Sequence, residues 1–435
     1  MPNWLGDGVM ATPLLRALPQ WIPSAAVTAL ARPLVQPALT GMPWVEQILD
    51  YPMHEGKIDI RATARMLAAR KFNTAIILPN NWRSALIAWA AAIPIRLGYD
   101  RDGRRVLLTR HLKAKLRDPA ELHAQLIQQQ ARLRLGASSH AFTPAPPQAE
   151  KKNDRFAEYI PPPRGLKKHL LRWHNFQPLS TIEYYLQILD LLDVPALPPA
   201  PAEGQNAAAD GSTCGPADGS TRGSMPIKGY LVSRQMQLFL TTGEQSSAEK
   251  ILQDHQVGGR YAILFPGANF GASKCWPAER FASLAQWLIS QQPHAGWMLM
   301  LAGSPAEKPM LDAIYNQLTP LQRLRTIHLA ALNAGAGVPL GVVKALVAKA
   351  GLVVCNDTGP RHFAAAFQRP LVTLFGPTDP RWAQTYDEQE QILRVPVECG
   401  PCQLKKCPID HRCMLGITLD MVKVAVARAI EERRS

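Results

Sequence analysis

Short apolar runs alternate with longer amphipathic stretches over the first 100 residues of the chain. The apolar runs at 27–31, 45–51 and 75–78 have the length and composition of buried strands. The stretches at 60–71 and 84–93 repeat their apolar positions with helical spacing. Strands that alternate with helices are typical of a parallel sheet covered by helices, so this half of the chain is predicted to have an α/β fold.

The same alternation resumes beyond residue 228. A well-patterned helix at 180–192 ends the first half, and an amphipathic helix at 419–433 ends the chain. Between them, strands are predicted at 261–265, 297–301, 352–354 and 370–375, and helices at 246–253, 278–291, 310–318 and 340–349. The second half is therefore predicted to be another doubly wound α/β unit.

A change of composition separates the two halves. Pro, Ala, Gly, Ser and Thr dominate residues 195–228, where Asp-Gly-Ser-Thr occurs twice, and this composition is typical of a flexible linker or insert. We therefore predict an N-terminal domain over 1–194, a low-complexity linker over 195–228, a C-terminal domain over 229–414 and a C-terminal helix over 415–435.

The stretch after the predicted strand at 352–354 contains the strongest local signal. A polar loop with Asp357, Thr358 and Gly359 is followed by Pro360, which suits the first position of a helix. Free backbone N–H groups and the helix dipole attract anions at such a helix start. The loop therefore predicts a site for a phosphorylated ligand, unless Asp357 and Thr358 only cap the helix.

Charge narrows the possible partners. The 435 residues are 47% hydrophobic and carry a formal net charge of +14, which implies nucleic acid, an acidic membrane surface, phosphorylated substrates or a generally basic surface. Two basic runs are interpreted either as solvated loops or as docking sites for an anionic surface; their members are Arg101, Arg104, Arg105, Arg110, His111, Lys113, Lys115 and Arg117, and then Lys167, Lys168, His169, Arg172 and His174. The chain has no apolar run of roughly 18 residues and no signal-peptide pattern at its start, so a cytoplasmic location is expected.

Four of the seven cysteines cluster near the C-terminus, at Cys399, Cys402, Cys407 and Cys413, with His411 among them. An odd number of cysteines, most of them in one short stretch, argues against a framework of structural disulfides. This spacing can hold tetrahedral zinc or an iron–sulfur cluster, and free or redox-active thiols are the alternative. Cys214, Cys275 and Cys355 are interpreted as isolated thiols.

Five short motifs follow predicted strand ends or the first turn, where ligands bind in doubly wound sheets. They are Leu5-Gly6-Asp7, Pro266-Gly267-Ala268, Ser273-Lys274-Cys275-Trp276-Pro277, Gly303-Ser304-Pro305-Ala306-Glu307 and Asn356-Asp357-Thr358-Gly359-Pro360-Arg361-His362. In this order the set resembles the bacterial ADP-heptose:lipopolysaccharide heptosyltransferases, glycosyltransferase family 9, and the cysteine-rich tail resembles the heptosyltransferase II branch. The resemblance implies an inverting enzyme of GT-B architecture, with two Rossmann-like doubly wound domains facing a cleft.

The resemblance implies two catalytic residues. Asp7 is expected to act as the general base that takes the proton from the acceptor hydroxyl. Lys274 is expected to pair with the donor diphosphate and to stabilise charge on the departing ADP. The alternatives are that Asp7 caps a helix and that Lys274 is a surface lysine ahead of a helix start.

The other implied contacts are with the donor. Glu307 is expected to bind the ribose hydroxyls, or else to be a glutamate favoured in the first turn of a helix. Thr358 and Gly359 are expected to contact phosphate, and Asp357 to bind sugar hydroxyls. His362 is expected to aid phosphate or heptose binding, or to be a buried structural histidine, and Val338 is expected to flank the adenine.

The function implied is transfer of L-glycero-D-manno-heptose from ADP-heptose to the inner core of lipopolysaccharide, as the second heptose. The expected partners are ADP-heptose and a lipid A–Kdo–heptose acceptor at the inner membrane face, with no catalytic cofactor and no nucleic acid. Two alternatives remain, namely a transferase for another nucleotide sugar and a non-catalytic, metal-bearing nucleic-acid-binding protein.

The start of the chain departs from the family pattern. The family has an apolar strand directly before Leu-Gly-Asp, whereas here Leu5-Gly6-Asp7 lies almost at Met1, so either the first strand is missing or the start codon is mis-assigned. Residues 6–8, Gly-Asp-Gly, are predicted to form a turn that leads into a helix at 14–18.

Overall fold

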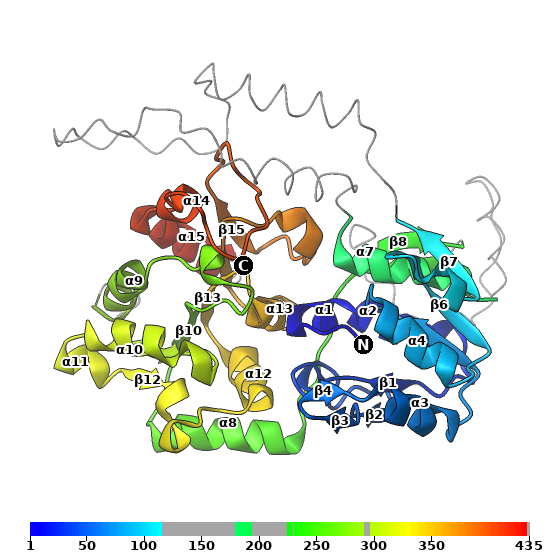
Figure 1. Cartoon of the computed structure of the whole chain (residues 1–435). Helices are drawn as coiled ribbons and strands as arrows, with labels where there is room; N and C mark the ends of the chain where they lie inside the picture. Colours follow the sequence, from blue (N-terminus) through cyan, green and yellow to red (C-terminus); the bar gives the residue numbers. More distant parts are fainter. Residues whose placement is uncertain (115–178, 194–223, 229, 291–295, 433–435) are drawn as a thin grey trace, which may run out of the picture.

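Two α/β halves lie side by side in the computed structural model, and the N-terminus lies near their junction (Figure 1). The structure describes residues 1–114, 179–193, 224–228, 230–290 and 296–432. The basic run at 167–174 and most of the predicted linker at 195–228 lie outside these residues, as does Cys214. The last residues of that predicted linker form β8 (Ser224–Ile227), which pairs with β9 (Tyr230–Ser233) against the N-terminal half.

The C-terminal half contains a six-stranded parallel sheet. Its spatial order is β12 (Thr326–His328), β11 (Met298–Leu301), β10 (Tyr261–Phe265), β13 (Leu352–Asn356), β14 (Leu371–Phe375) and β15 (Gln391–Arg394). Successive strands are added toward one edge of the sheet from β10 to β12 and toward the other edge from β13 to β15. The order in which strands are added therefore reverses between β10 and β13, and ligands bind at such a switch point, beyond the carboxyl ends of the strands.

Helices cover both faces of this sheet. On one face, α9 (Ala278–Ser290), α10 (Lys308–Asn316) and α15 (Leu419–Glu432) pack on apolar side chains of the central strands. On the other face lie α8 (Thr242–Asp254), α12 (Leu340–Lys349) and α13 (Gly359–Ala366). The short α11 (Pro320–Arg323) and α14 (Arg412–Leu415) complete the set in the described residues. The four strands predicted for this half are confirmed as β10, β11, β13 and β14, and β12 and β15 were not predicted.

The N-terminal half contains two separate parallel sheets. One pairs β1 (Thr28–Leu30) with β2 (Gln47–Leu49), and the other has the order β5 (Thr74–Ile77), β6 (Ile95–Asp100) and β7 (Arg110–Lys113). A small hairpin joins β3 (Met53–His54) and β4 (Lys57–Ile58). The helices are α2 (Thr12–Trp21), α3 (Ile60–Ala68), α4 (Trp82–Ala90) and α7 (Thr181–Leu186), followed by the 3₁₀ turn η3 (Gln187–Leu191).

A cavity of about 610 Å³ lies between β1 and β5 and is lined by both strands and by apolar side chains of α2 and α4. Within the part of the chain that the structure describes, β1 pairs only with β2 and β5 only with β6, so each presents one unpaired edge to this cavity. In the described residues no strand precedes α1 (Leu5–Met10), and the Met1 nitrogen donates a hydrogen bond to the Leu30 carbonyl at 2.8 Å. The cavity separates the two N-terminal sheets.

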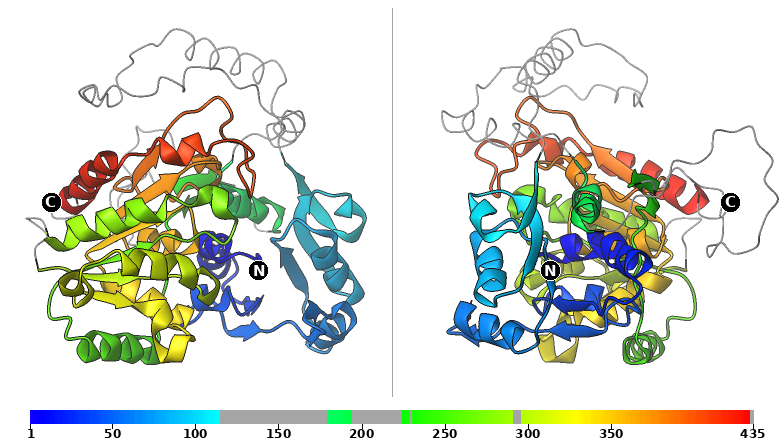
Figure 2. Two further views of the ribbon diagram at one scale, coloured as in Figure 1. Left: turned by 60° about the vertical axis from the view of Figure 1, so that its left-hand side comes forward. Right: turned by 90° about the vertical axis from the view of Figure 1, so that its right-hand side faces the viewer.

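The predicted Gly-Asp-Gly turn is wrong, because residues 6–8 lie inside the helix α1. α1 packs against α13 of the other half, and in the left view of Figure 2 the dark-blue start of the chain lies between the two halves. A Cβ atom at Gly6 would lie 2.6 Å from His362 Cδ2, and one at Gly359 would lie 3.0 Å from Leu5 Cδ2. The two glycines are therefore needed for close helix packing rather than for a turn, and this packing places Asp7 at the junction.

The first basic run is only partly a charged surface. Arg104 is fully buried, and its guanidinium donates hydrogen bonds to the carbonyls of Tyr99 and Pro79 and to Asn80 Oδ1. Arg110 pairs with Asp193. The interpretation of Arg104 as part of a solvated or docking loop is therefore wrong, because its buried guanidinium binds backbone carbonyls around β6. Among the helices of the described residues, none combines the length and hydropathy needed to cross a bilayer.

Candidate active site

A cavity of about 990 Å³ opens between the two halves, beyond the carboxyl ends of β10 and β13. Side chains from α1 form part of one wall, and the loops of the C-terminal half form the others. The structure brings every predicted catalytic and donor-binding residue to this cavity: Asp7, Lys274, Glu307, Val338, Asp357, Thr358, Gly359 and His362. Its volume lies at the upper end of the range for ligand sites.

Asp7 lies in the first turn of α1, and its carboxylate has no hydrogen-bond partner among the described residues. Burial raises the pKa of Asp7 from 3.8 to about 6; the positive charge of Lys274 opposes this shift and the negative charge of Asp357 adds to it. A carboxylate with a raised pKa and no partner is suited to accepting a proton near neutral pH. The geometry therefore does not support the interpretation of Asp7 as a capping residue, since its side chain caps nothing.

Lys274 belongs to the 3₁₀ turn η5 (Ala272–Lys274), and its Nζ lies 2.5 Å from Asp357 Oδ2. It also lies 4.8 Å from the centre of the Phe270 ring, a cation–π contact. Only 12% of the Lys274 side chain is exposed, so the interpretation of a free surface lysine is wrong. The carboxylate of Asp357, which belongs to the same half, holds the Lys274 ammonium at the cavity.

Asp357 has a partner that the sequence did not reveal. Its Oδ2 accepts hydrogen bonds from Lys274 Nζ and, at 2.7 Å, from Thr378 Oγ1. Burial acts to raise the pKa of Asp357, but the charges of Lys274 and Arg361 outweigh it and keep the pKa below its usual value. Asp357 is therefore ionised and orients Lys274, and Thr378 is a site residue that no motif indicated.

A buried amide joins the loops that carry these groups. Asn356, the last residue of β13, donates from Nδ2 to the Pro266 carbonyl at 2.6 Å and accepts at Oδ1 from the Trp276 backbone N–H at 3.2 Å. It thereby ties the end of β10 to the segment just after Lys274. Because a buried amide requires its partners, this arrangement restricts the position of the lysine.

The start of α13 faces the same cavity. Thr358 is its N-cap residue, Gly359 its first residue and Pro360 its second, one position later than predicted. The Thr358 side chain makes no capping hydrogen bond, so its hydroxyl stays available to a ligand. In the same helix, Arg361 is fully buried and forms a bidentate ion pair with Glu390, with distances of 2.6 and 2.8 Å. The helix start is thus firmly held while its capping groups remain free for an anion.

His362 is buried against Gly6 of α1. Burial, together with the neighbouring charge of Arg361, lowers the pKa of His362 to about 3, so its imidazole is neutral at physiological pH. Its Nδ1 has no hydrogen-bond partner among the described residues. Any contact with phosphate or sugar is therefore a neutral hydrogen bond rather than an ion pair.

Glu307 caps its own turn and also lines the cavity. Its Oε2 accepts hydrogen bonds from the Ser304 backbone N–H at 2.7 Å and from Ser304 Oγ at 2.8 Å, which caps the turn η6 (Pro305–Glu307). Its other oxygen lies beside Gly267, where a Cβ would be 2.0 Å from Oε1. One carboxylate oxygen thus has a structural role, and Glu307 as a whole still lines the cavity together with Val338.

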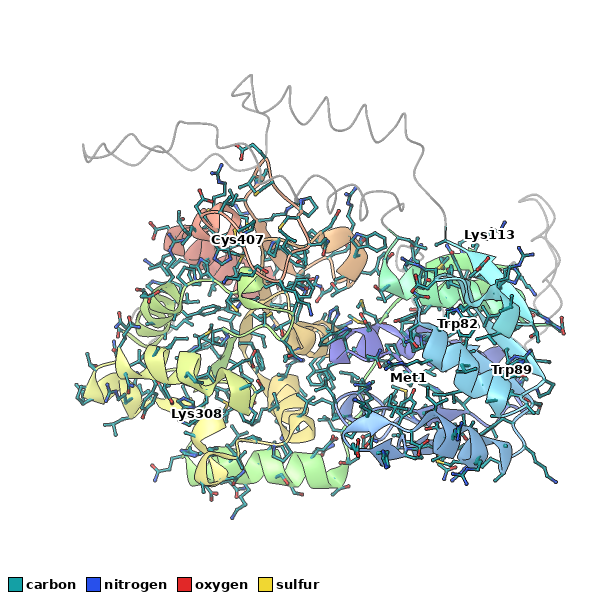
Figure 3. All side chains as sticks on the ribbon, in the orientation of Figure 1. Met1, Trp82, Trp89, Lys113, Lys308 and Cys407 are labelled. Atoms are coloured by element: carbon teal, nitrogen blue, oxygen red, sulfur yellow. The ribbon has the colours of Figure 1, made fainter. Side chains whose placement is uncertain are left out.

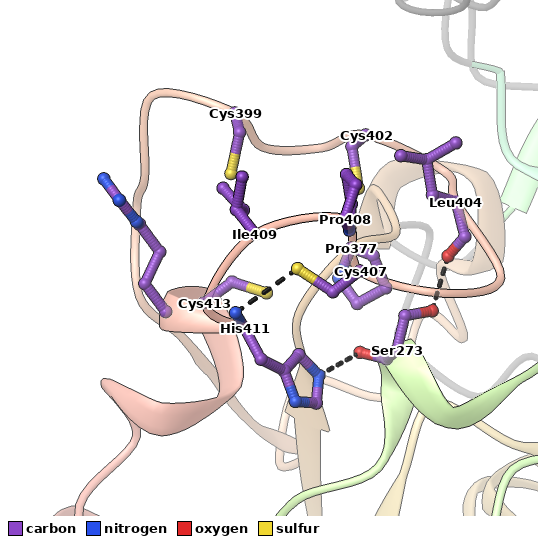
Figure 4. A pocket seen from close by; sticks show the side chains of 11 residues that line it. Ser273, Pro377, Cys399, Cys402, Leu404, Cys407, Pro408, Ile409, His411 and Cys413 are labelled. Carbon is purple, nitrogen blue, oxygen red and sulfur yellow. Dashed lines mark hydrogen bonds between the residues drawn. The ribbon is translucent and has the colours of Figure 1, made fainter. Parts of the chain in front are cut away.

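The cysteine-bearing loop, residues 395–411, reaches the same cavity. Gln403 of this loop lines the cavity. The loop also forms hydrogen bonds with Ser273, the residue directly before Lys274. Ser273 Oγ donates to the Leu404 carbonyl, the Ser273 N–H donates to the Lys405 carbonyl at 3.2 Å, and the His411 ring lies 2.7 Å from the Ser273 carbonyl (Figure 4). This loop therefore helps to position Lys274, a contact that no sequence pattern predicted.

The four clustered cysteines line one small cavity with a volume of about 10 Å³, roughly the space of one water molecule (Figure 4). All four are free thiols, and Cys402 and Cys413 are buried. Among the described residues, no three thiol, imidazole or carboxylate groups are gathered closely enough to hold an ion. The thiols thus share one cavity without forming a preassembled metal site.

Comparisons with known proteins place the chain in one family. Residues 60–161 and 230–412 match Glycosyltransferase family 9 (heptosyltransferase). The chain is 25% identical to lipooligosaccharide heptosyltransferase 2 of Haemophilus influenzae, over 97% of this chain and 95% of that protein. It is also 25% identical to lipopolysaccharide heptosyltransferase 2 of Salmonella typhimurium, over 91% of this chain and 86% of that protein.

Solved structures agree on the fold. The structure of ADP-heptose lps heptosyltransferase II of Escherichia coli superposes with a TM-score of 0.65 and 21% sequence identity, covering all of this chain and 98% of that one. The glycosyl transferase family 9 structure from Veillonella parvula gives a TM-score of 0.63 at 18% identity, covering 98% of this chain and 94% of that one. The predicted architecture of two Rossmann-like halves facing a cleft is confirmed.

Proposed function

We propose that this chain, which belongs to glycosyltransferase family 9, the heptosyltransferase family, transfers heptose from ADP-heptose to the inner core of lipopolysaccharide. The heptose that it adds is the second one. The observation that carries the proposal is the arrangement of charge across the cavity. An unpaired carboxylate, Asp7, comes from one half, and a held cation, Lys274, comes from the other. A glycosyl transfer needs both a proton acceptor and a stabiliser of the leaving group.

The proposed reaction is a direct displacement. Asp7 takes the proton of the acceptor hydroxyl as that oxygen bonds to the anomeric carbon. The bond from this carbon to the diphosphate breaks on the opposite face, the electron pair leaves with ADP, and the configuration inverts. Lys274 and the free N–H groups at the start of α13 stabilise the charge that develops on the diphosphate.

The remaining groups are proposed to hold the donor. The Thr358 hydroxyl and the Gly359 N–H contact phosphate at the start of α13, and Glu307 binds the ribose hydroxyls through the side that does not cap its own turn. Val338 flanks the adenine. Asp357 orients Lys274 and reaches sugar hydroxyls, and His362 adds one neutral hydrogen bond.

The reaction as proposed uses no cofactor, because every proton and charge is handled by side chains or the helix start. The donor is ADP-heptose, and the acceptor is a lipid A–Kdo–heptose glycolipid at the inner membrane face, with the protein peripheral to that membrane. A transferase for another nucleotide sugar is the nearest alternative. The nucleic-acid-binding alternative is not favoured, since it leaves the cavity between the halves without a role.

Calorimetric titration separates these possibilities. ADP-heptose is expected to bind the full chain with one site, and UDP-glucose and GDP-mannose to bind far more weakly at the same concentrations. Equal or tighter binding of a UDP- or GDP-sugar would point to the other transferase. No nucleotide-sugar binding, together with tight, salt-dependent binding of nucleic acid, would overturn the proposal.

The acidic side of the pH profile follows from Asp7. Only the ionised carboxylate accepts a proton, and burial raises its pKa to about 6. We expect kcat/KM for transfer to be constant above about pH 7 and to fall tenfold for each pH unit well below pH 6. The measurement is the initial rate of ADP release at subsaturating acceptor between pH 4.5 and 8.5; an inflection near pH 4 would show that the base is an ordinary exposed carboxylate.

We further propose that Cys399, Cys402, Cys407 and Cys413 hold a structural zinc ion. The four thiols line one small cavity but are not gathered closely enough in the structure to hold an ion, so the loop 395–411 has to close further to give the tetrahedral set of thiolates that zinc takes. We expect about one zinc per chain by elemental analysis, lost in Cys407→Ser and retained in the control Cys214→Ser. Four thiols that titrate freely in zinc-treated protein, or disulfides found by mass, would contradict this assignment.

A further inference from the structure

Two exposed tryptophans lie on one face of α4. Trp82 and Trp89 are 43% and 53% exposed, and seven residues along a helix is close to two full turns, so both project from the same side. Figure 3 shows both on the outer side of the N-terminal half, with Lys113 on the same side and Lys308 and Cys407 in the other half. Exposed aromatic pairs of this kind mark an interaction surface.

A third apolar side chain extends this surface. Val106 in the turn η2 (Arg104–Leu107) is 76% exposed, and η2 packs against α4. The Trp82 indole nitrogen lies close to Gly103, directly before η2, so the two elements present one continuous face. We call Trp82, Trp89 and Val106 the apolar patch.

Positive charge predominates in the part of the chain that carries the apolar patch. Residues 53–113 contain twelve Lys or Arg and only four Asp or Glu. Although Arg104 and Arg110 are engaged internally, Arg83 and Arg105 lie beside the patch with exposed side chains, and Lys113 is exposed on β7. The face thus combines amphipathic indoles with cations, the combination that suits the headgroup region of an anionic bilayer.

We propose that the apolar patch and its basic rim dock the N-terminal half onto an anionic phospholipid surface. The indoles lie at the headgroup level and the cations pair with lipid phosphates, so the protein lies on the bilayer without crossing it. This inference rests on the proposed function only in that the proposed acceptor is a lipid; the docking itself needs no sugar chemistry.

The test is co-sedimentation of the full chain with sucrose-loaded vesicles of phosphatidylcholine, with and without phosphatidylglycerol. We expect binding only to the anionic vesicles, weakened about tenfold or more by Trp82→Ala with Trp89→Ala, and similarly by Arg83→Glu with Arg105→Glu. The matched control is Leu321→Ala with Leu324→Ala, which removes exposed apolar side chains of the other half and should leave binding unchanged.

The outcomes are distinct. Binding that is equal in wild type and both patch variants overturns the proposal, as does failure of the wild type to bind anionic vesicles. Dimerisation in solution that disappears in the tryptophan variant would also overturn it, by assigning the face to a second copy. Calorimetric titration of ADP-heptose on the same variants should be unchanged, so a failed docking test is distinguishable from a failed donor assignment.

Discussion

Replacing Asp7 with Asn is expected to lower the rate of heptosyl transfer by about 10²–10⁴-fold, the usual contribution of a positioned general base. The amide keeps the shape of the side chain but cannot accept the proton of the acceptor hydroxyl. The affinity for ADP-heptose should change little, because in the proposed reaction Asp7 acts on the acceptor and Lys274 acts on the donor. The measurement is single-turnover transfer together with the calorimetric Kd of the donor for both proteins.

The same substitution should stabilise the protein at pH 8. The folded-state pKa of Asp7 is raised to about 6, so the folded state favours the protonated form, and its stability falls as pH rises from about 4 to 6. Asn removes this cost, which we estimate at roughly 1–2 kcal/mol after allowing for partial exposure. The control is Asp254→Asn, an exposed carboxylate at the end of α8. Retained activity, or lost stability at pH 8, would indicate that Asp7 has a structural role.

Replacing Lys274 with Ala is expected to weaken donor binding and to lower the rate of transfer by about 10²–10³-fold. Among the described residues that line the cavity, Lys274 is the one Lys or Arg, and its ammonium lies beside Asp357. Lys349→Ala serves as the control, because Lys349 forms an exposed pair with Glu249 outside the cavity. Donor affinity and rate should be unchanged in this control.

Lys274→Ala should also cost stability. Removing one partner of a buried ion pair leaves Asp357 without its main counter-charge, an effect of about 3 kcal/mol in comparable pairs. Adding Asp357→Asn should restore part of that stability but none of the activity. Recovery of transfer by the double variant would contradict a role for the lysine on the leaving group and would leave it as a structural partner only.

The sequence was most informative where strands are buried on both faces. β10 and β13 are continuous apolar runs, and their predicted positions are confirmed. β12 and β15 are short and contain polar residues such as Thr326 and Gln391, so no run of apolar residues marks them. α1 was missed because its glycines are typical of a turn, whereas the packing of α1 on α13 requires them in a helix.

The composition of the site was predictable, but its internal pairing was not. The structure brings every predicted catalytic and donor-binding residue to one cavity, whereas the four clustered cysteines line another. The Lys274–Asp357 pair joins residues 83 positions apart, and the contribution of Thr378 depends on a loop that no motif covers. Likewise, Arg104 belongs to a basic run in sequence but is buried by the turn that follows β6. Such pairings depend on tertiary packing, which periodicity and spacing do not encode.

In the proposed reaction, an activated heptose binds between the two halves, of which one supplies the base and the other holds the leaving group. This reaction is tested most directly by the mass and anomeric configuration of a heptose–Kdo–lipid A acceptor after incubation with the chain and ADP-heptose. We expect the acceptor to gain one heptose with inverted configuration, and we expect Asp7→Asn to abolish this gain. An unmodified acceptor while ADP-heptose is bound, or a product with retained configuration, would contradict it.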